Sequence, residues 1–286
     1  MKWVDAVIQG LLLGGLYAQY AIGMALMFGV MGIVNIAHGD LVILLALIGV
    51  SLAAAFNFAP ALIILLLMPM GAAIGWGLQR GILNRVIGTD PLPSLIATFG
   101  LSMALQNFMM EVWSADTRSL YAGKISILSV PIGPLYLGVL PIIVFAFAVV
   151  LTGGLHAVLR VTPFGRALRA AAADRDAATL SGVNTKAIYA RATAIAVGIL
   201  GAAAVFQATR TTVAPADGGA QLIYAFEAVI IGGMGNIWGA FLGALILGVA
   251  QVVGSRISPG WGILFGHIVF LIVLTLRPRG LMSRHQ

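Results

Sequence analysis

The sequence predicts an all-α protein, a polytopic transmembrane bundle of about eight to ten membrane-spanning or broken helices. Hydrophobic residues make up 60% of the 286 residues, charged residues only 9%, and the mean hydropathy is +1.05. This composition excludes an ordinary soluble domain. Cutting the chain at every charged residue leaves seven uncharged stretches of at least 18 residues, at 6–39, 41–79, 91–110, 125–159, 192–209, 228–255 and 257–276. Because about 20 residues cross a hydrocarbon core, these stretches allow at most about ten crossings. Little of the chain remains for a soluble domain, so we expect a single transmembrane domain over residues 1–286, with a cytoplasmic loop at about 160–191.

Helices are favoured over a β-barrel, because stretches such as residues 60–68 are apolar on every side whereas barrel strands alternate. The absence of cysteine excludes a disulfide framework, a thiol nucleophile and a thiolate metal site. The net charge of +7 lies at the ends of the apolar stretches, so membrane topology explains it better than nucleic-acid binding, and we expect lipid but no nucleic acid as a partner. The first stretch is too long for a signal peptide and is expected to stay in the mature protein.

Residues 6–39 are too many for one crossing and too few for two with a turn. We therefore expect a broken or re-entrant helix near residues 29–39, and the side of the N-terminus stays open. Three regions hold 11 of the 16 Lys and Arg residues, and the positive-inside rule puts all three in the cytoplasm. They contain Arg80 and Arg85; Arg160, Arg166, Arg169, Arg175, Lys186 and Arg191; and Arg277, Arg279 and Arg284.

The later elements follow from this assignment. Residues 91–110 run outward, residues 111–130 form an external loop, the chain returns after about residue 134, and residues 192–209 exit again. From Arg210 outside, an odd number of crossings must lead to a cytoplasmic C-terminus. The count is satisfied by a short helix ending near Gly232, a second over about 237–254 and a third over 261–276.

Many of the 36 glycines are spaced four residues apart, which places small surfaces on one helix face and lets helix backbones pack closely in lipid. The alternative is that they are tolerated glycines facing lipid. The sets are Gly10 and Gly14; Gly71 and Gly75; and Gly235, Gly239 and Gly243. The phrases FGVMGIVN (28–35) and IGGMGNIW (231–238) are weakly similar, as an internal duplication of a transporter would be.

The loop at about 160–191 carries six positive and two negative charges in a chain that otherwise hardly leaves the membrane. Within it, residues 174–184 predict a short helix with Asp174 as N-cap and Gly182 as C-terminal stop. Ala177, Leu180 and Val183 recur at a spacing of three and form a narrow apolar stripe. The stripe would dock into a groove on a soluble partner. The alternative is an interfacial helix lying on the lipid headgroups.

Several motifs resemble the permease subunits of branched-chain amino acid ABC importers. They occur in the order of that family across essentially the whole chain. They are GLYA (15–18) with FGVMGIVNIAHGD (28–40), IATFGLS (96–102), GGMGNIWGA (232–240) and RPRGL (277–281).

The resemblance implies a non-catalytic, multi-pass subunit of a bacterial-type cytoplasmic (inner) membrane. It implies a second related permease subunit, identical or different, two cytoplasmic ATPases and an extracytoplasmic solute-binding protein. The chain contains no Walker A motif, so we expect no cofactor in this chain and ATP and Mg²⁺ to be used by the partner ATPases. The region 166–184 is similar to the coupling helix of the family, which implies that five residues transmit nucleotide-driven closure: Asp174, Asp176, Ala177, Leu180 and Gly182.

The solute implied is a branched-chain or related amino acid. Two departures leave it open: Gln251 stands where many relatives carry an acidic residue, and the external loop 113–123, with Arg118, does not match the family pattern. The alternatives are urea, a short amide or a small carboxylate carried by the same architecture.

Polar groups inside apolar segments are costly and tend to face a bundle interior or a water-filled path. Asn35 and His38 would line an inner gate or satisfy the backbone at a helix turn, and Asp40 is expected to do the latter. Glu227 is either a path residue or an interhelical partner for Arg210 or Arg256. The candidates for the solute path are Gln19, Asn35, His38, Thr98, Gln106, Asn107 and Glu227.

Two other function classes compete with an importer subunit. A secondary transporter or channel would need ionisable groups inside the membrane, and Glu227 is nearly the only deep one. An intramembrane enzyme would need a catalytic cluster, but HExxH and GxSxG are absent and we expect no catalytic residues. A lone His without a second ligand at a suitable spacing does not predict a metal site.

Overall fold

The computed structural model describes residues 2–88, 90–133 and 135–282, and it is almost entirely helical. The predicted all-α class is confirmed. Within these ranges, seven helices are long and apolar enough to cross a membrane. They are α1 (Lys2–Met31), α2 (His38–Phe56), α3 (Pro60–Leu78) with its continuation through a π-helical turn (Gln79–Leu83) and α4 (Asn84–Val86), α5 (Leu92–Trp113), α6 (Val139–Val161), α9 (Thr185–Arg210) and α11 (Ile237–Ile257).

Shorter elements complete the fold. They are η2 (Gly123–Ser126), β1 (Ser129–Ile132), β2 (Leu135–Gly138), α7 (Pro163–Ala173), α8 (Arg175–Leu180), η3 (Pro215–Asp217), α10 (Gly218–Gly232) and α12 (Gly262–Leu276). The predicted helix end at Gly232 and the two helices that follow it are confirmed. The expectations that fall on Pro134 and Arg284 lie outside the described residues.

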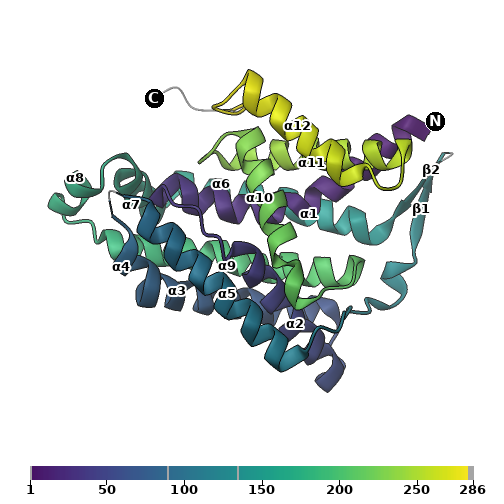
Figure 1. The fold of residues 1–286 in the computed structure, drawn as a ribbon, viewed down its shortest axis with the longest axis horizontal. Coiled ribbons are helices and arrows are strands. Elements are labelled where there is room, and N and C mark those ends of the chain that lie inside the picture. The colour runs from purple at the N-terminus through teal and green to yellow at the C-terminus, as the bar shows by residue number, and fades with distance from the viewer. Residues whose placement is uncertain (1, 89, 134, 283–286) are drawn as a thin grey trace.

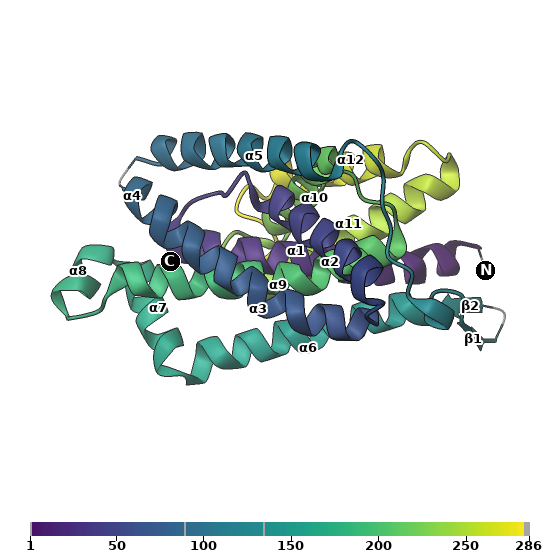
Figure 2. The same ribbon diagram turned by 90° about the horizontal axis from the view of Figure 1, so that it is seen from below.

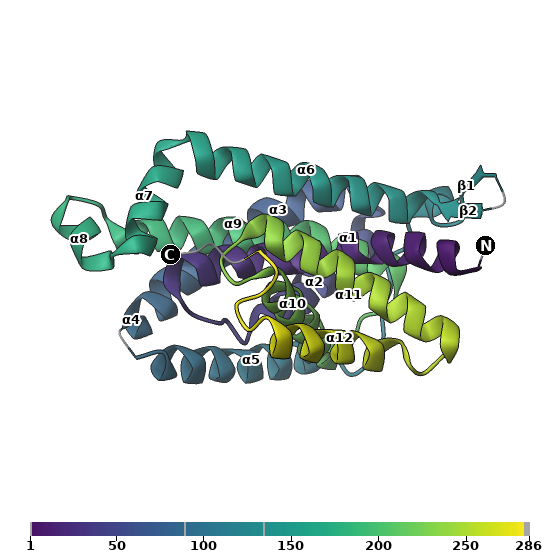
Figure 3. The ribbon, with the colours of Figure 1, turned by 90° about the horizontal axis from the view of Figure 1, so that it is seen from above.

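The long helices lie side by side, with α8 at one end of the bundle and the N-terminus with the β1–β2 hairpin at the other (Figures 1 and 2). The centre is formed by α1 and α9, in each of which 83% of the apolar window is buried, against 17–22% in α3, α5 and α6. Figure 3 shows α5 and α6 on opposite sides of this central pair. The outer helices therefore expose apolar faces suited to lipid or to another membrane subunit.

The chain breaks after α1, as the length of the first apolar stretch predicts. α1 ends at Met31, Gly32 adopts a φ of 65°, and α2 begins only at His38. The side chain of Asn35 accepts from the backbone N–H of Ala37 at 3.1 Å. The His38 ring donates to the carbonyl of Tyr20 at 3.0 Å, so α2 starts beside the middle of α1. The segment 32–37 therefore returns the chain into the bundle.

A second break follows α10, which crosses the long helices at a steep angle (Figure 1). Gly233 and Gly235 take φ values of 108° and 80°, which favour glycine. A β-carbon on Gly29 would lie 2.8 Å from the Cα of Gly235, so the two weakly similar phrases of the sequence touch where their helices break.

Close glycine packing is confirmed for the two pairs and for Gly239 and Gly243, whereas Gly235 lies before the start of α11 and not on its face. Added β-carbons on Gly10 and Gly14 would meet the backbone of α11, and those on Gly71 and Gly75 the backbone of α9, at 2.5–2.6 Å. Gly239 and Gly243 would meet the backbone of α10 at 2.4 and 2.1 Å. A side chain at either position would clash with backbone atoms of α10. The two glycines therefore allow the backbones of α10 and α11 to lie in close contact.

Two features lie beyond the sequence prediction. An antiparallel hairpin begins at the end of the expected external loop 111–130 and continues beyond it, with Ser129 paired to Gly138 and Ile132 to Leu135. The loop that carries Arg118 forms a bridge with Val213, with Arg118 N–H to Val213 O at 2.9 Å. This bridge ties the end of α5 to the segment between α9 and α10.

Candidate functional site

The segment α7–α8 protrudes from one end of the bundle (Figures 1 and 2). Its start is capped by Thr162, whose hydroxyl accepts from Gly165 N–H at 3.1 Å. Asp174 caps α8 by accepting from the N–H groups of Asp176 and Ala177, both at 2.9 Å. Gly182, with a φ of 85°, ends the helical turn. The N-cap and the stop predicted from sequence are therefore both present.

One face of α8 is anchored and the other is open. Ala178 is buried, and the guanidinium of Arg175 donates to the carbonyl of Ile87 at 3.1 Å. Leu180 is 90% exposed, and Ala177 is exposed beside it. The predicted stripe is shorter than expected, because Val183 is half-buried and its N–H bonds back to the carbonyl of Ala178. The exposed leucine on an anchored helix is suited to a groove on another protein.

A polar cluster joins α2 to α5. Asp40 is 1% exposed, and its two carboxylate oxygens accept from the Ser102 hydroxyl at 2.5 Å and from the Gln106 amide at 3.0 Å. The expectation that Asp40 only satisfies backbone groups at the turn is wrong. The start of α10 packs on the same carboxylate, since a β-carbon on Gly218 would lie 2.0 Å from its oxygen.

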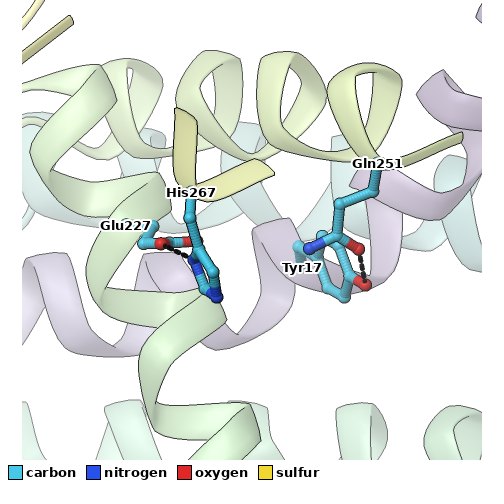
Figure 4. A network of polar contacts seen from close by, with 4 residues as sticks. All are labelled: Tyr17, Glu227, Gln251 and His267. Atoms are coloured by element: carbon cyan, nitrogen blue, oxygen red, sulfur yellow. Dashed lines mark hydrogen bonds and ion pairs between the residues drawn. The ribbon is translucent and has the colours of Figure 1, made fainter. Parts of the chain in front are cut away.

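A second polar cluster joins α10 to α12 (Figure 4). Glu227 is 3% exposed; one carboxylate oxygen pairs with the His267 ring, and the other has no hydrogen-bond partner within the described ranges. The expected partners of Glu227 were Arg210 or Arg256, and the structure corrects this. Arg256 pairs with Asp5, while Arg210 makes no ion pair with any residue the structure describes.

Tyr17 links the central helix to the helices around it. Its hydroxyl donates to the side-chain oxygen of Gln251 on α11 at 2.6 Å (Figure 4). Its ring stacks on Tyr224 of α10 at a centroid distance of 4.9 Å. Gln251 thus has a neutral hydroxyl as its partner. The spacing of Tyr224 and Glu227 puts both on one face of α10.

Two cavities lie at different ends of α10. The smaller, of about 240 Å³, is lined by α1, the end of α9 and the first half of α10, and Arg210 is one of its lining residues. The larger, of about 1330 Å³, lies beside α7, the end of α6 and the C-terminal tail, and Arg160, Arg169 and Arg279 line it.

The predicted path residues have different surroundings. Gln106 and Glu227 belong to the two interhelical clusters above. Gln19 is fully buried; its amide donates to Gly15 and Val144 carbonyls at 3.4 Å, and its side-chain oxygen has no partner among the described residues.

The remaining candidates bond to backbone. Asn35 and His38 bond as described at the α1–α2 break. Thr98 donates to the carbonyl of Ser94 on its own helix at 2.9 Å. Asn107 is exposed and donates to the carbonyl of Met103 at 2.8 Å.

Sequence reasoning missed part of the polar network. His267 lies in the apolar stretch 257–276, so the criterion applied to the other candidates would have found it. Tyr17 carried no such signal, because one tyrosine in an apolar helix looks like core. No group of three or more His, Cys, Asp or Glu that could hold a metal ion occurs in the portion of the chain described.

Comparison with known proteins identifies the family to which the chain belongs. The profile of the family described as "Branched-chain amino acid transport system / permease component" matches residues 6–274. The chain is 28% identical to the high-affinity branched-chain amino acid transport system permease protein BraD of Pseudomonas aeruginosa, over 99% of this chain and 96% of the relative. It is also 28% identical to the corresponding protein LivH of Escherichia coli K12, with the same coverage of both chains.

A more distant relative comes from an archaeon. The probable branched-chain amino acid transport permease protein LivH of Methanocaldococcus jannaschii is 24% identical, over 94% of this chain and 88% of the relative. No solved structure matches the chain. The family profile covers the apolar helices α1 to α11, both chain breaks and the exposed α8, so this multi-pass membrane protein belongs to the family of branched-chain amino acid transport permeases.

Proposed function

We propose that the chain is the non-catalytic membrane subunit of an ATP-driven importer. A second, related permease subunit completes the path, and an extracytoplasmic binding protein delivers the solute. The assembly contains two ATPase subunits that use ATP and Mg²⁺, and one of them binds this chain at α7–α8. The solute is a branched-chain or related amino acid, in keeping with the names of the relatives. The family, together with the exposed Leu180 on an anchored α8, supports this proposal.

The charge distribution supports an orientation. Arg160, Arg166 and Arg169 lie at the end of the bundle that carries α7–α8, and positive charge favours the cytoplasmic side. We assign this end, and the C-terminus, to the cytoplasm. The N-terminus then lies outside with the hairpin, because the two lie together at the opposite end (Figure 2). This orientation places α8 where cytoplasmic ATPases reach it and the smaller cavity on the outer side of α10.

Leu180→Asp tests the role of α8. The leucine is 90% exposed, so the change leaves the bundle intact, while an aspartate would have to be buried in the ATPase groove. We expect co-purification of the ATPase to be lost and membrane insertion to be normal. Ile127→Asp is the matched control, because Ile127 is an apolar residue 78% exposed at the opposite end. Retention of the ATPase by Leu180→Asp would place its docking site elsewhere.

A further inference from the structure

The smaller cavity contains a cation without a partner. Nη1 of Arg210 is buried and has no hydrogen-bond partner among residues 2–88, 90–133 and 135–282. Arg210 as a whole is half-buried, and a buried donor of a charged group costs free energy unless it is hydrogen-bonded. The guanidinium forms a planar fork of donors whose preferred partner is a carboxylate. The position of Arg210 at the end of α9, lining the cavity, therefore suits an anionic ligand.

Two of the neighbouring polar side chains, those of Tyr17 and Gln207, are already hydrogen-bonded. The Tyr17 hydroxyl donates to Gln251, as Figure 4 shows. The side-chain oxygen of Gln207 accepts from Tyr20 at 2.8 Å, and its amide donates to Thr211 at 2.9 Å. These bonds hold Gln207 and Tyr17 as fixed walls of the cavity and leave the guanidinium of Arg210 for a ligand.

The same cavity offers acceptors and apolar walls. The side-chain oxygen of Gln221 is buried and has no partner in the described structure. Asp217 uses one carboxylate oxygen for the Ala214 N–H at 2.7 Å, which leaves the other free to accept. Leu13 and Leu16 supply apolar surface. At about 240 Å³ the cavity is just below the roughly 300 Å³ at which pockets for drug-sized ligands begin, so it fits one small solute.

We propose that this cavity, the Arg210 pocket, binds a free α-amino acid with an apolar side chain. Arg210 holds the carboxylate, Asp217 and Gln221 accept from the ammonium group, and Leu13 and Leu16 contact the side chain. The proposal rests on the proposed function and narrows its solute class, because urea and short amides have no carboxylate for Arg210. Tyr224 also lines the pocket, and Glu227 lies three residues further along the same face of α10.

The chain has no cysteine, so a single introduced thiol can report on the pocket. Ala220 lines it and is exposed. We would assemble the complete transporter with Ala220→Cys in lipid nanodiscs, label it with an anionic methanethiosulfonate, and count the label on this chain by mass. Gly219→Cys is the matched control: Gly219 is exposed, does not line the pocket, and has no atoms within 4 Å of an added β-carbon.

L-leucine should protect Ala220→Cys from labelling and leave Gly219→Cys unprotected. Leucinamide, which lacks the carboxylate, should protect at least tenfold more weakly. Adding Arg210→Gln should raise the half-protecting concentration of leucine about tenfold to a hundredfold, since a hydrogen bond to a charged group is lost. Arg210→Lys keeps the positive charge but not the planar fork of donors. Its half-protecting concentration of leucine should lie between those of the native residue and Arg210→Gln.

Equal protection by leucine and leucinamide would overturn the proposal, and so would unchanged protection in Arg210→Gln. The comparison of ligands needs no change at Arg210, so it stands even if that variant fails to fold. Uptake of labelled leucine by the same transporter in liposomes separates the two proposals. Protection without uptake contradicts the proposed function only, whereas uptake without protection contradicts the Arg210 pocket only.

Discussion

Replacing Gly243 by Ala should force α10 and α11 apart. A β-carbon at this position would lie 2.1 Å from the carbonyl oxygen of Ala228 and 2.7 Å from the nitrogen of Gly232. Both are backbone atoms, which cannot rotate away as a side chain can. Since ordinary contact begins near 3.4 Å, the helices must separate by roughly 1 Å in an interior that packs without voids.

The two energies involved have opposite signs. Overpacking of this kind costs about 1–3 kcal/mol, whereas alanine is favoured over glycine inside a helix by at most about 1 kcal/mol. We therefore expect Gly243→Ala to lower the free energy of unfolding by about 1–2 kcal/mol. Gly154→Ala is the control, because Gly154 lies inside α6 with nothing within 4 Å of an added β-carbon, and it should be neutral or stabilising.

The assay is equilibrium unfolding in mixed detergent micelles, titrated with a denaturing detergent and followed by helix content. The unmodified chain and the two glycine variants are measured side by side. If Gly243→Ala were as stable as Gly154→Ala, the close backbone contact between α10 and α11 would be refuted.

Three further pairs of substitutions test the polar contacts. Asp40→Asn and Ser102→Ala should be non-additive, with a coupling of about 1–3 kcal/mol in a double-mutant cycle of unfolding; additivity would deny the bond. His267→Ala should destabilise by about 1–3 kcal/mol because it leaves the buried Glu227 unpaired, and adding Glu227→Gln should restore part of the loss, which thermal unfolding would show. Asp174→Ala should cost about 1 kcal/mol of local helix stability and reduce solute-stimulated ATP hydrolysis, whereas Asp174→Ser, which still caps, should retain most of it; equal activity of both would deny the role of the cap.

Local signals made much of the fold predictable. The excess length of residues 6–39 predicts a break near residues 29–39, and the structure has it at 32–37. A cap and a glycine stop predict α8 around Asp174 and Gly182. Glycines four residues apart predict the close packing of α11, because a surface without side chains on one helix face can be recognised from the spacing within that helix alone. The β1–β2 hairpin was missed because its strands have four residues each and no long alternating pattern.

The polar clusters depend on contacts that no local pattern encodes. Asp40 and Ser102 are 62 positions apart, and their bond follows from how α5 packs on α2. Glu227 was singled out as a costly buried acid, but choosing His267 over Arg210 or Arg256 requires knowing that α12 lies beside α10. The roles of the seven predicted path residues stay predictions.

The central claim is that this chain forms part of the solute path and that ATPases bound at α8 drive transport. Measuring solute uptake with and without the partner subunits tests this claim most directly. Liposomes would contain the chain alone, or the chain with the second permease, the ATPases and the binding protein, with radiolabelled leucine outside and ATP inside. We predict uptake against a concentration gradient only in the complete assembly, and its loss in Leu180→Asp. Robust uptake by the chain alone would contradict the account.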